Sequence, residues 1–234
     1  MDRAVKYINN QIKHPFDTLL ILGSGFRDLV NNFSLYGKMK FESIPDFPIA
    51  SAPGHESTLY FSKWKNQHLA IMAGRFHYYE GFSFEEITFP LSVLKKLGIK
   101  NLILTNASGG LSERIKIGEP VWIDNFLSFS KNDLFDYQKK SGINYAFMNG
   151  PNFGTAAEYK ALQKLGVDLV GMSTFPEIQA AKKLNLKIVA LSVPVCSYYP
   201  SENLSEPTEQ EVIAASRKAL PKVFKMINQL EWNS

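Results

Sequence analysis

The chain of 234 residues contains one cysteine, Cys196, so an intramolecular disulfide and a cysteine-rich zinc site are both excluded. It also lacks an uninterrupted apolar run of about 18 residues, which a membrane-spanning helix requires. Residues 1–16 are amphipathic and do not contain the apolar segment of a secretory signal. These absences predict a cytoplasmic protein that makes no membrane contact.

A concentrated basic region is missing as well, although the formal net charge is +4. The densest basic groups, residues 37–40 and 93–100, are short and typical of solvated turn or helix faces. Nucleic-acid binding requires a basic stripe interleaved with aromatic residues, so no nucleic-acid partner is expected. The composition is 45% hydrophobic and 21% charged, with no linker or repeat, which predicts a single domain over residues 1–234.

Short apolar runs alternate with segments of helical period. The helix expected over residues 84–97 is the clearest, because Ile87, Leu91 and Leu94 share a face and Gly98 follows as a C-terminal stop. The expected strands are residues 18–22, 59–64, 68–73, 101–105, 120–124, 144–148, 167–172 and 187–193. The other expected helices are residues 1–13, 155–165, 175–184 and 208–230. This alternation of apolar strands with helices predicts an α/β fold with a central mixed or largely parallel β-sheet flanked by helices.

Glycines and hydrogen-bond donors follow four of the predicted strands. They lie at residues 23–25, 74–77, 106–110 and 171–174. In α/β folds, ligands bind beyond the carboxyl ends of the strands. Four such segments at one edge of the sheet predict a binding pocket there.

Several catalytic and cofactor motifs are absent. A dinucleotide fingerprint starting at Gly23 and Gly25 would need a third glycine where Asp28 stands, and no P-loop occurs. No G-x-S-x-G elbow supports a serine hydrolase. The four histidines lack metal-ligand spacing, so no metal is expected. The turn that contains Ser24 either holds a phosphate through its hydroxyl and backbone N–H groups or is a tight turn without a ligand.

Arg75 and His77 carry the strongest chemical signal among individual residues. They follow the apolar run 68–73, and strand alternation would place both on one side with Phe76 turned away. Arginine grips two oxygens of a phosphate, and histidine adds another donor. Glu80 is spaced to orient the imidazole of His77. The alternative is structural, with Arg75 paired to a carboxylate and His77 satisfied inside the core.

Together, these segments resemble the trimeric purine nucleoside phosphorylase family, which includes the methylthioadenosine phosphorylases. The resemblance is carried by ILGSG at residues 21–25, GH at 54–55, the block from Gly74 to Leu111, GPNF at 150–153 and the segment 157–183. It implies a phosphorylase-type fold, a homotrimer, and cleavage of a nucleoside by inorganic phosphate into ribose 1-phosphate and free base. Phosphate is then a co-substrate, and no other cofactor is implied.

The resemblance also implies a role for individual residues. Tyr79 and Met172 would contact the ribose, and Phe153 would stack on the base. The enzyme would align the two reactants, which lowers a barrier by about 7–11 kcal/mol, and the phosphate dianion would stabilise the positive charge on the sugar. The residues that would hold the phosphate are Ser24, His55, Arg75, His77, Ala107 and Ser173.

The residues that contact the base in the family are changed here. Gly154 stands where the family has a glutamate that hydrogen-bonds the purine. Val195 and Cys196 stand where it has a Thr–Asn pair whose asparagine contacts the base. The candidate catalytic residues are therefore His77, Arg75 and, at that asparagine position, Cys196. A site that hydrogen-bonds its substrate rejects an analogue lacking the bonded group by a factor of about 10⁴ to 10⁵. Losing both the glutamate and the asparagine therefore predicts altered or relaxed base preference.

Two further positions depart from the family. Glu209 aligns with a histidine that reaches the 5′-hydroxyl of the sugar, and residues 125–144 are shorter than the insertion that contacts the neighbouring subunit's site. The base would then be held by other groups, with Ser197, Tyr198, Tyr199 and Glu202 as candidates.

Three hypotheses follow. The first is an active phosphorylase of purine nucleosides with altered base recognition. The second is a catalytically weak homologue that binds phosphate or a phosphosugar in a regulatory role. The third is a hydrolase in which water replaces phosphate, which the retained phosphate-binding residues disfavour.

Overall fold

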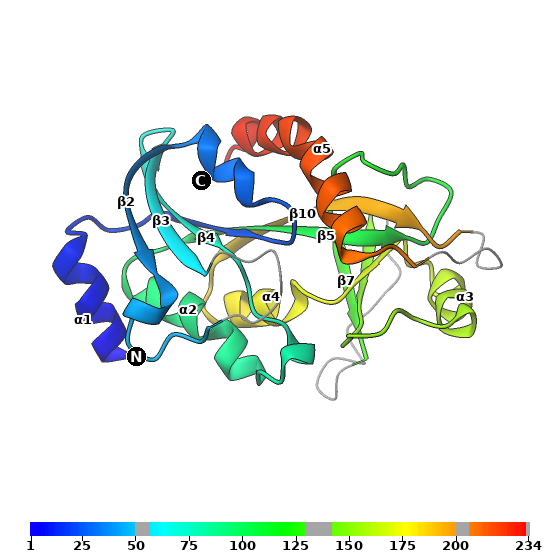
Figure 1. The fold of residues 1–234 in the computed structure, drawn as a ribbon, viewed down its shortest axis with the longest axis horizontal. Coiled ribbons are helices and arrows are strands. Elements are labelled where there is room, and N and C mark those ends of the chain that lie inside the picture. Colours follow the sequence, from blue (N-terminus) through cyan, green and yellow to red (C-terminus); the bar gives the residue numbers. More distant parts are fainter. Residues whose placement is uncertain (50–56, 130–141, 200–205, 233–234) are drawn as a thin grey trace.

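A computed structural model describes residues 1–49, 57–129, 142–199 and 206–232, and these form a mixed β-sheet flanked by helices (Figure 1). The strands are β1 (Thr18–Leu22), β2 (Ser34–Lys40), β3 (Thr58–Trp64), β4 (Gln67–Ala73), β5 (Asn101–Gly110), β6 (Val121–Trp122), β7 (Asn125–Ser128), β8 (Asn144–Phe147), β9 (Leu169–Gly171) and β10 (Lys187–Ser197). The helices are α1 (Asp2–Gln11), α2 (Phe84–Lys96), α3 (Ala156–Lys164), α4 (Phe175–Lys183) and α5 (Glu209–Gln229). Short 3₁₀ turns are η1 (Arg27–Asn32), η2 (Phe41–Ser43) and η3 (Tyr78–Glu80).

The predicted α/β fold, its five helices and its eight strands are confirmed, with differences at strand ends. Strands β2 and β7 were not predicted. Most of β2 is exposed at the sheet edge, so it lacks the apolar run by which strands are recognised. Strand β5 continues to Gly110 and β10 to Ser197, beyond the predicted ends, because pairing between these two strands overrides the low strand propensity of glycine and proline.

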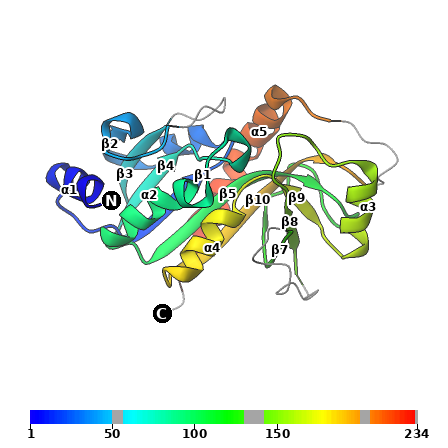
Figure 2. The same ribbon diagram turned by 90° about the horizontal axis from the view of Figure 1, so that it is seen from below.

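Both faces of the sheet are covered. In β1, Leu19 and Ile21 pack into a core with α2 and α4, whereas Leu20 and Leu22 pack into a second core with η1 and α5. Figure 2 shows α2 and α4 on one side of the strands and α5 on the other. Strands β1, β4, β5 and β10 run parallel, and burial on both faces explains their continuous apolar character.

A smaller group of elements extends the sheet on one side. Strands β9, β8 and β7 pack with α3 around a third core that includes Tyr159 and Tyr198 (Figure 2). Strand β5 joins the two groups: its ladder with β1 ends at Leu104, and its ladder with β9 begins at Gly109. Between these two ladders, residues 106–108 of β5 line a cavity.

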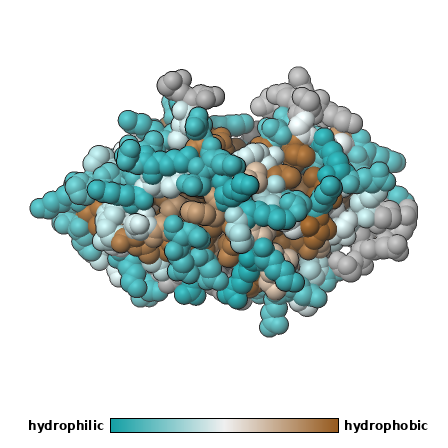
Figure 3. Space-filling model, turned by 90° about the horizontal axis from the view of Figure 1, so that it is seen from above, coloured by the Kyte–Doolittle hydropathy of each residue, from teal (hydrophilic) through white to brown (hydrophobic). Residues whose placement is uncertain are grey.

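The surface agrees with the scattered charges of the sequence. Figure 3 shows a face covered mainly by hydrophilic side chains, with apolar groups gathered between them. Within the described residues, no helix is both long and apolar enough to cross a membrane.

Candidate active site

One cavity of about 560 Å³ lies at the carboxyl ends of β1, β4 and β9 and along residues 106–109 of β5, within the size range of small-molecule sites. All four strand-end segments singled out in the sequence contribute to its wall. They do so through Gly23 and Ser24; Arg75 and His77; Asn106, Ala107, Ser108 and Gly109; and Gly171, Met172 and Ser173. The predicted pocket is therefore present, built from segments far apart in the sequence.

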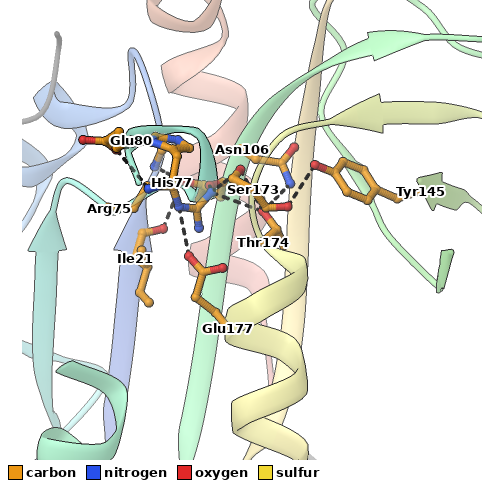
Figure 4. Close-up of polar contacts among 11 residues, drawn as sticks. Ile21, Arg75, His77, Glu80, Asn106, Tyr145, Ser173, Thr174 and Glu177 are labelled. Carbon is orange, nitrogen blue, oxygen red and sulfur yellow. Dashed lines mark hydrogen bonds and ion pairs between the residues drawn. The ribbon is translucent and has the colours of Figure 1, made fainter. Parts of the chain in front are cut away.

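Arg75 is the most buried cation of the cavity, with an exposed fraction of 1%. Its Nε lies 3.2 Å from the Glu177 carboxylate, and its Nη1 donates to the hydroxyls of Ser173 (2.9 Å) and Thr174 (3.2 Å) (Figure 4). A third donation reaches the Thr105 carbonyl at 3.0 Å. The ion pair proposed as the structural alternative thus exists, and the same guanidinium also lines the cavity.

The turn that presents Ser173 is strained. Thr174 has φ 78° and ψ −40°, and the Phe175 N–H donates to the Ser173 carbonyl at 2.9 Å, as in a γ-turn. Such a conformation costs about 1–3 kcal/mol for a β-branched residue. The Asn106 side chain donates to the Thr174 hydroxyl at 2.9 Å, which together with Arg75 fixes the turn. The Ser173 hydroxyl accepts from Arg75, lies 3.3 Å from the Thr174 hydroxyl, and belongs to a residue that lines the cavity.

His77 is oriented by Glu80, as the spacing predicted. Its Nδ1 lies 2.8 Å from the Glu80 carboxylate, which also accepts from the His77 backbone N–H at 2.9 Å. The Tyr79 ring stacks on the imidazole with centroids 4.8 Å apart. Burial, with smaller contributions from the charges of Glu80 and Glu209, raises the pKa of Tyr79 to about 12, so its hydroxyl stays protonated at neutral pH.

The backbone path to these residues differs from the prediction. Strand β4 ends at Ala73, so Arg75 and His77 do not alternate along a strand, and Tyr79 lies in the turn η3. Phe76 nevertheless points into the core, with 2% exposed, as expected. The predicted sidedness is confirmed, although an irregular segment rather than a strand produces it.

The other end of the cavity is aromatic and carries few polar groups. Phe153, Gly154, Tyr159, Cys196 and Tyr198 line it, and the Tyr159 and Tyr198 rings stack at 4.4 Å. Burial raises the pKa of the Cys196 thiol, so the thiol stays neutral and can act only as a weak hydrogen-bond donor.

Gly154 has its backbone against Tyr159. Its N–H donates to the Tyr159 hydroxyl at 2.9 Å, and a Cβ added there would lie 2.6 Å from a ring carbon of Tyr159. Tyr159 therefore fills the space beside position 154 and leaves no room for a larger side chain there.

We expect Gly154→Ala to lower the free energy of unfolding by about 1–3 kcal/mol through overpacking against Tyr159. In a Tyr159→Leu background the same substitution should cost at least about 0.5 kcal/mol less, because the clash is gone. Urea denaturation of the four proteins in this double-mutant cycle measures the coupling. Additive effects would show that Tyr159 does not constrain position 154.

All predicted site residues within the described part of the chain line this one cavity: Ser24, Arg75, His77, Tyr79, Ala107, Phe153, Gly154, Met172, Ser173 and Cys196. His55 lies outside the described residues, as does part of the segment 125–144. Sequence reasoning missed Glu177 and Tyr159, which carry no signal that separates them from ordinary helix-start residues and core aromatics, and it included Thr174 only as one donor of the segment 171–174. In the described ranges, no three His, Cys, Asp or Glu side chains are grouped as metal ligands would be.

Comparison with known proteins places the chain in a family. The sequence model of the phosphorylase superfamily matches residues 18–144 and 137–230. The chain belongs to the phosphorylase superfamily. Within it, the purine nucleoside phosphorylase of Bos taurus is 29% identical, over 97% of this chain and 92% of that protein.

Solved structures of the superfamily share this fold. A purine nucleoside phosphorylase of Schistosoma mansoni in complex with adenosine superimposes with a TM-score of 0.87 at 24% identity, covering 99% of this chain and 97% of that one. Isoform 2 from the same organism, in complex with cytosine and ribose 1-phosphate, gives 0.86 at 26% identity, covering 99% and 96%. The phosphorylase-type fold implied by the sequence is thereby confirmed.

Proposed function

We propose that this member of the phosphorylase superfamily is a purine nucleoside phosphorylase with altered base recognition. It cleaves a purine nucleoside or deoxynucleoside with inorganic phosphate. A phosphate oxygen bonds to the anomeric carbon, the C–N bond breaks, and the base leaves with the electron pair and takes up a proton. The products are ribose or deoxyribose 1-phosphate and free base.

The observation that carries this proposal is the convergence of Ser24, Arg75, His77 and Ser173 on one cavity from three strand ends. An arginine, a histidine and two hydroxyls suit the oxygens of a phosphate. Glu177 holds Arg75 and Glu80 holds His77 in place, so the geometry is set before the ligand arrives. The relatives named as purine nucleoside phosphorylases, and one relative bound to ribose 1-phosphate, support the same reaction.

The side chains have separate tasks in this scheme. Ser24, His55, Arg75, His77, Ala107 and Ser173 hold the phosphate, Tyr79 and Met172 contact the sugar, and Phe153 stacks on the base. Aligning phosphate and nucleoside supplies about 7–11 kcal/mol of the barrier reduction, and the phosphate dianion stabilises the developing oxocarbenium charge. No side-chain nucleophile takes part, which agrees with a neutral Cys196 thiol.

Phosphate dependence tests the proposal. Purified protein is incubated with inosine, guanosine and adenosine, with and without phosphate, and base and sugar phosphate are quantified. We expect base release only with phosphate, with one equivalent of ribose 1-phosphate. Release without phosphate would indicate a hydrolase, and phosphate binding without turnover would indicate the regulatory homologue, which the relatives do not favour.

The homotrimer and the cytoplasmic location belong to the same proposal. The family resemblance implies the homotrimer, and the composition of the chain implies the cytoplasmic location. Light scattering on the purified protein would give a mass three times 26.4 kDa if the assembly is a trimer.

A further inference from the structure

We propose that the Tyr198 hydroxyl binds the leaving base and replaces the missing glutamate and asparagine of the family, so that the enzyme accepts both 6-oxo and 6-amino purines. This inference rests on the proposed function for its substrate class. It concerns the aromatic end of the cavity, which Tyr198 lines together with Phe153 and Cys196.

Tyr198 is the candidate that the structure selects. Of the residues that the sequence offered as substitutes, Glu202 lies outside the described chain, and neither Ser197 nor Tyr199 lines the cavity. The Ser197 hydroxyl donates to the Tyr199 carbonyl, and the Tyr199 hydroxyl reaches Glu113. Tyr198 lines the cavity beside Phe153 and Cys196.

The Tyr198 ring is fixed from several sides. It stacks on Tyr159 at 4.4 Å and packs at a tilt against Phe153, with centroids 6.1 Å apart. Its backbone N–H donates to the Gly110 carbonyl at 2.7 Å. A Cβ on Gly109 would lie 2.2 Å from the ring, so a side chain at position 109 would displace it. A ring held this firmly is suited to recognition because little conformational entropy is lost when a ligand binds.

The hydroxyl of this ring is buried and has no partner of good hydrogen-bond geometry in the described part of the chain; its polar neighbours are the Cys196 thiol and the Tyr159 hydroxyl. The two other buried tyrosines near the cavity differ, because the Tyr159 hydroxyl accepts from the Gly154 N–H and the Tyr145 hydroxyl donates to the Ser173 carbonyl. An unsatisfied buried hydroxyl costs free energy, and such groups are rare in folded proteins. A base bound in the cavity can supply the missing partner.

The chemistry of a phenol fits a departing base. Burial, together with the neighbouring Cys196 and Tyr159, raises the pKa of Tyr198 above its usual value, so the group remains a neutral donor. Its hydrogen bond to a ring nitrogen or an exocyclic oxygen strengthens as the base gains negative charge, which lowers the barrier to C–N cleavage. A hydroxyl also accepts, so it can pair with a 6-amino group as well as a 6-oxo group.

Tyr198→Phe is the decisive variant, with Tyr159→Phe as its matched control. We expect Tyr198→Phe to lower kcat/KM for inosine at least tenfold, to leave the KM for phosphate unchanged, and to leave the unfolding temperature unchanged or raised. Tyr159→Phe should instead lower the unfolding temperature by about 2–4 °C, because it breaks a satisfied hydrogen bond.

Two further measurements test whether Tyr198 acts on the departing base. The activity lost in Tyr198→Phe should be less than threefold for 7-methylinosine, whose cationic base needs little stabilisation as it departs. The wild-type kcat/KM values for inosine and adenosine should lie within about tenfold of each other. A site built to hydrogen-bond only a 6-oxo or only a 6-amino purine would instead discriminate by about 10⁴ to 10⁵. Equal losses for both inosine substrates, a lowered unfolding temperature, or strong discrimination would overturn the inference.

Binding of free hypoxanthine, measured by calorimetry, separates this inference from the proposed function. We expect at least fivefold weaker binding in Tyr198→Phe, whether or not any nucleoside turns over. Unchanged hypoxanthine affinity would refute the role of Tyr198 while leaving phosphate-dependent cleavage intact. Failure of the wild type to cleave any nucleoside would refute the proposed function alone.

Discussion

Replacing Arg75 by alanine is expected to weaken phosphate binding at least tenfold and to lower the free energy of unfolding by about 3–5 kcal/mol. The stability loss follows because Glu177, 3.2 Å away and 3% exposed, would remain buried without its counter-charge. The hydroxyls of Ser173 and Thr174 would lose a donor as well. Calorimetric titration with phosphate and urea denaturation measure the two effects.

A double variant separates binding from folding. Arg75→Met with Glu177→Leu removes both charges and fills their volume, and such replacement of a buried ion pair is often neutral for stability. We expect it to recover most of the unfolding free energy but none of the phosphate affinity. Recovered affinity would show that Arg75 acts only on the fold, and undiminished affinity in Arg75→Ala would show that the phosphate site lies elsewhere.

Replacing Asp168 by alanine is expected to lower the free energy of unfolding by about 3 kcal/mol. Asp168 is 3% exposed and joins three segments of the smaller half of the sheet. Its carboxylate accepts from Arg114 Nε at 2.6 Å and from the Asn144 N–H at 2.9 Å. Removing it leaves the Asn144 N–H without that acceptor and takes away the carboxylate that Arg114 binds. Urea denaturation at pH 7 measures the loss.

The stabilisation by Asp168 should depend on pH. Burial raises the pKa of Asp168, but the hydrogen bonds from Arg114 and the Asn144 N–H outweigh it and hold the pKa below its usual value. Since the folded pKa is depressed, the stabilisation is complete above the unfolded pKa of about 3.9 and is lost as the pH falls through the folded value. The stability gap between wild type and Asp168→Asn should therefore narrow below about pH 4. A constant gap would contradict the charge-based origin of the effect.

Much of the fold was predictable because apolar runs and helix signals are local. The α2 helix shows this, since Gly98, with φ +110°, lies directly after its C-cap. Strand β2 escaped detection because its pairing with β3, rather than an apolar face, makes it a strand. The far ends of β5 and β10 escaped for the same reason, since each is stabilised by the other.

For the active site, the sequence by itself determined which residue types stand at the strand ends, and with them the part of the pocket for which we propose phosphate binding. Arg75, His77, Ser24 and Ser173 were identifiable because each lies next to a buried strand or within a segment shared with the family. Tertiary structure alone decided which groups hold these side chains and which aromatic rings line the rest of the cavity. Glu177 meets Arg75 across 102 positions of sequence, and Tyr159 meets Tyr198 across 39. Contacts over such separations are set by the packing of the sheet and leave no local pattern. The ion pair of Arg75 with Glu177 and the burial of the Tyr198 hydroxyl could therefore be found only in the folded chain.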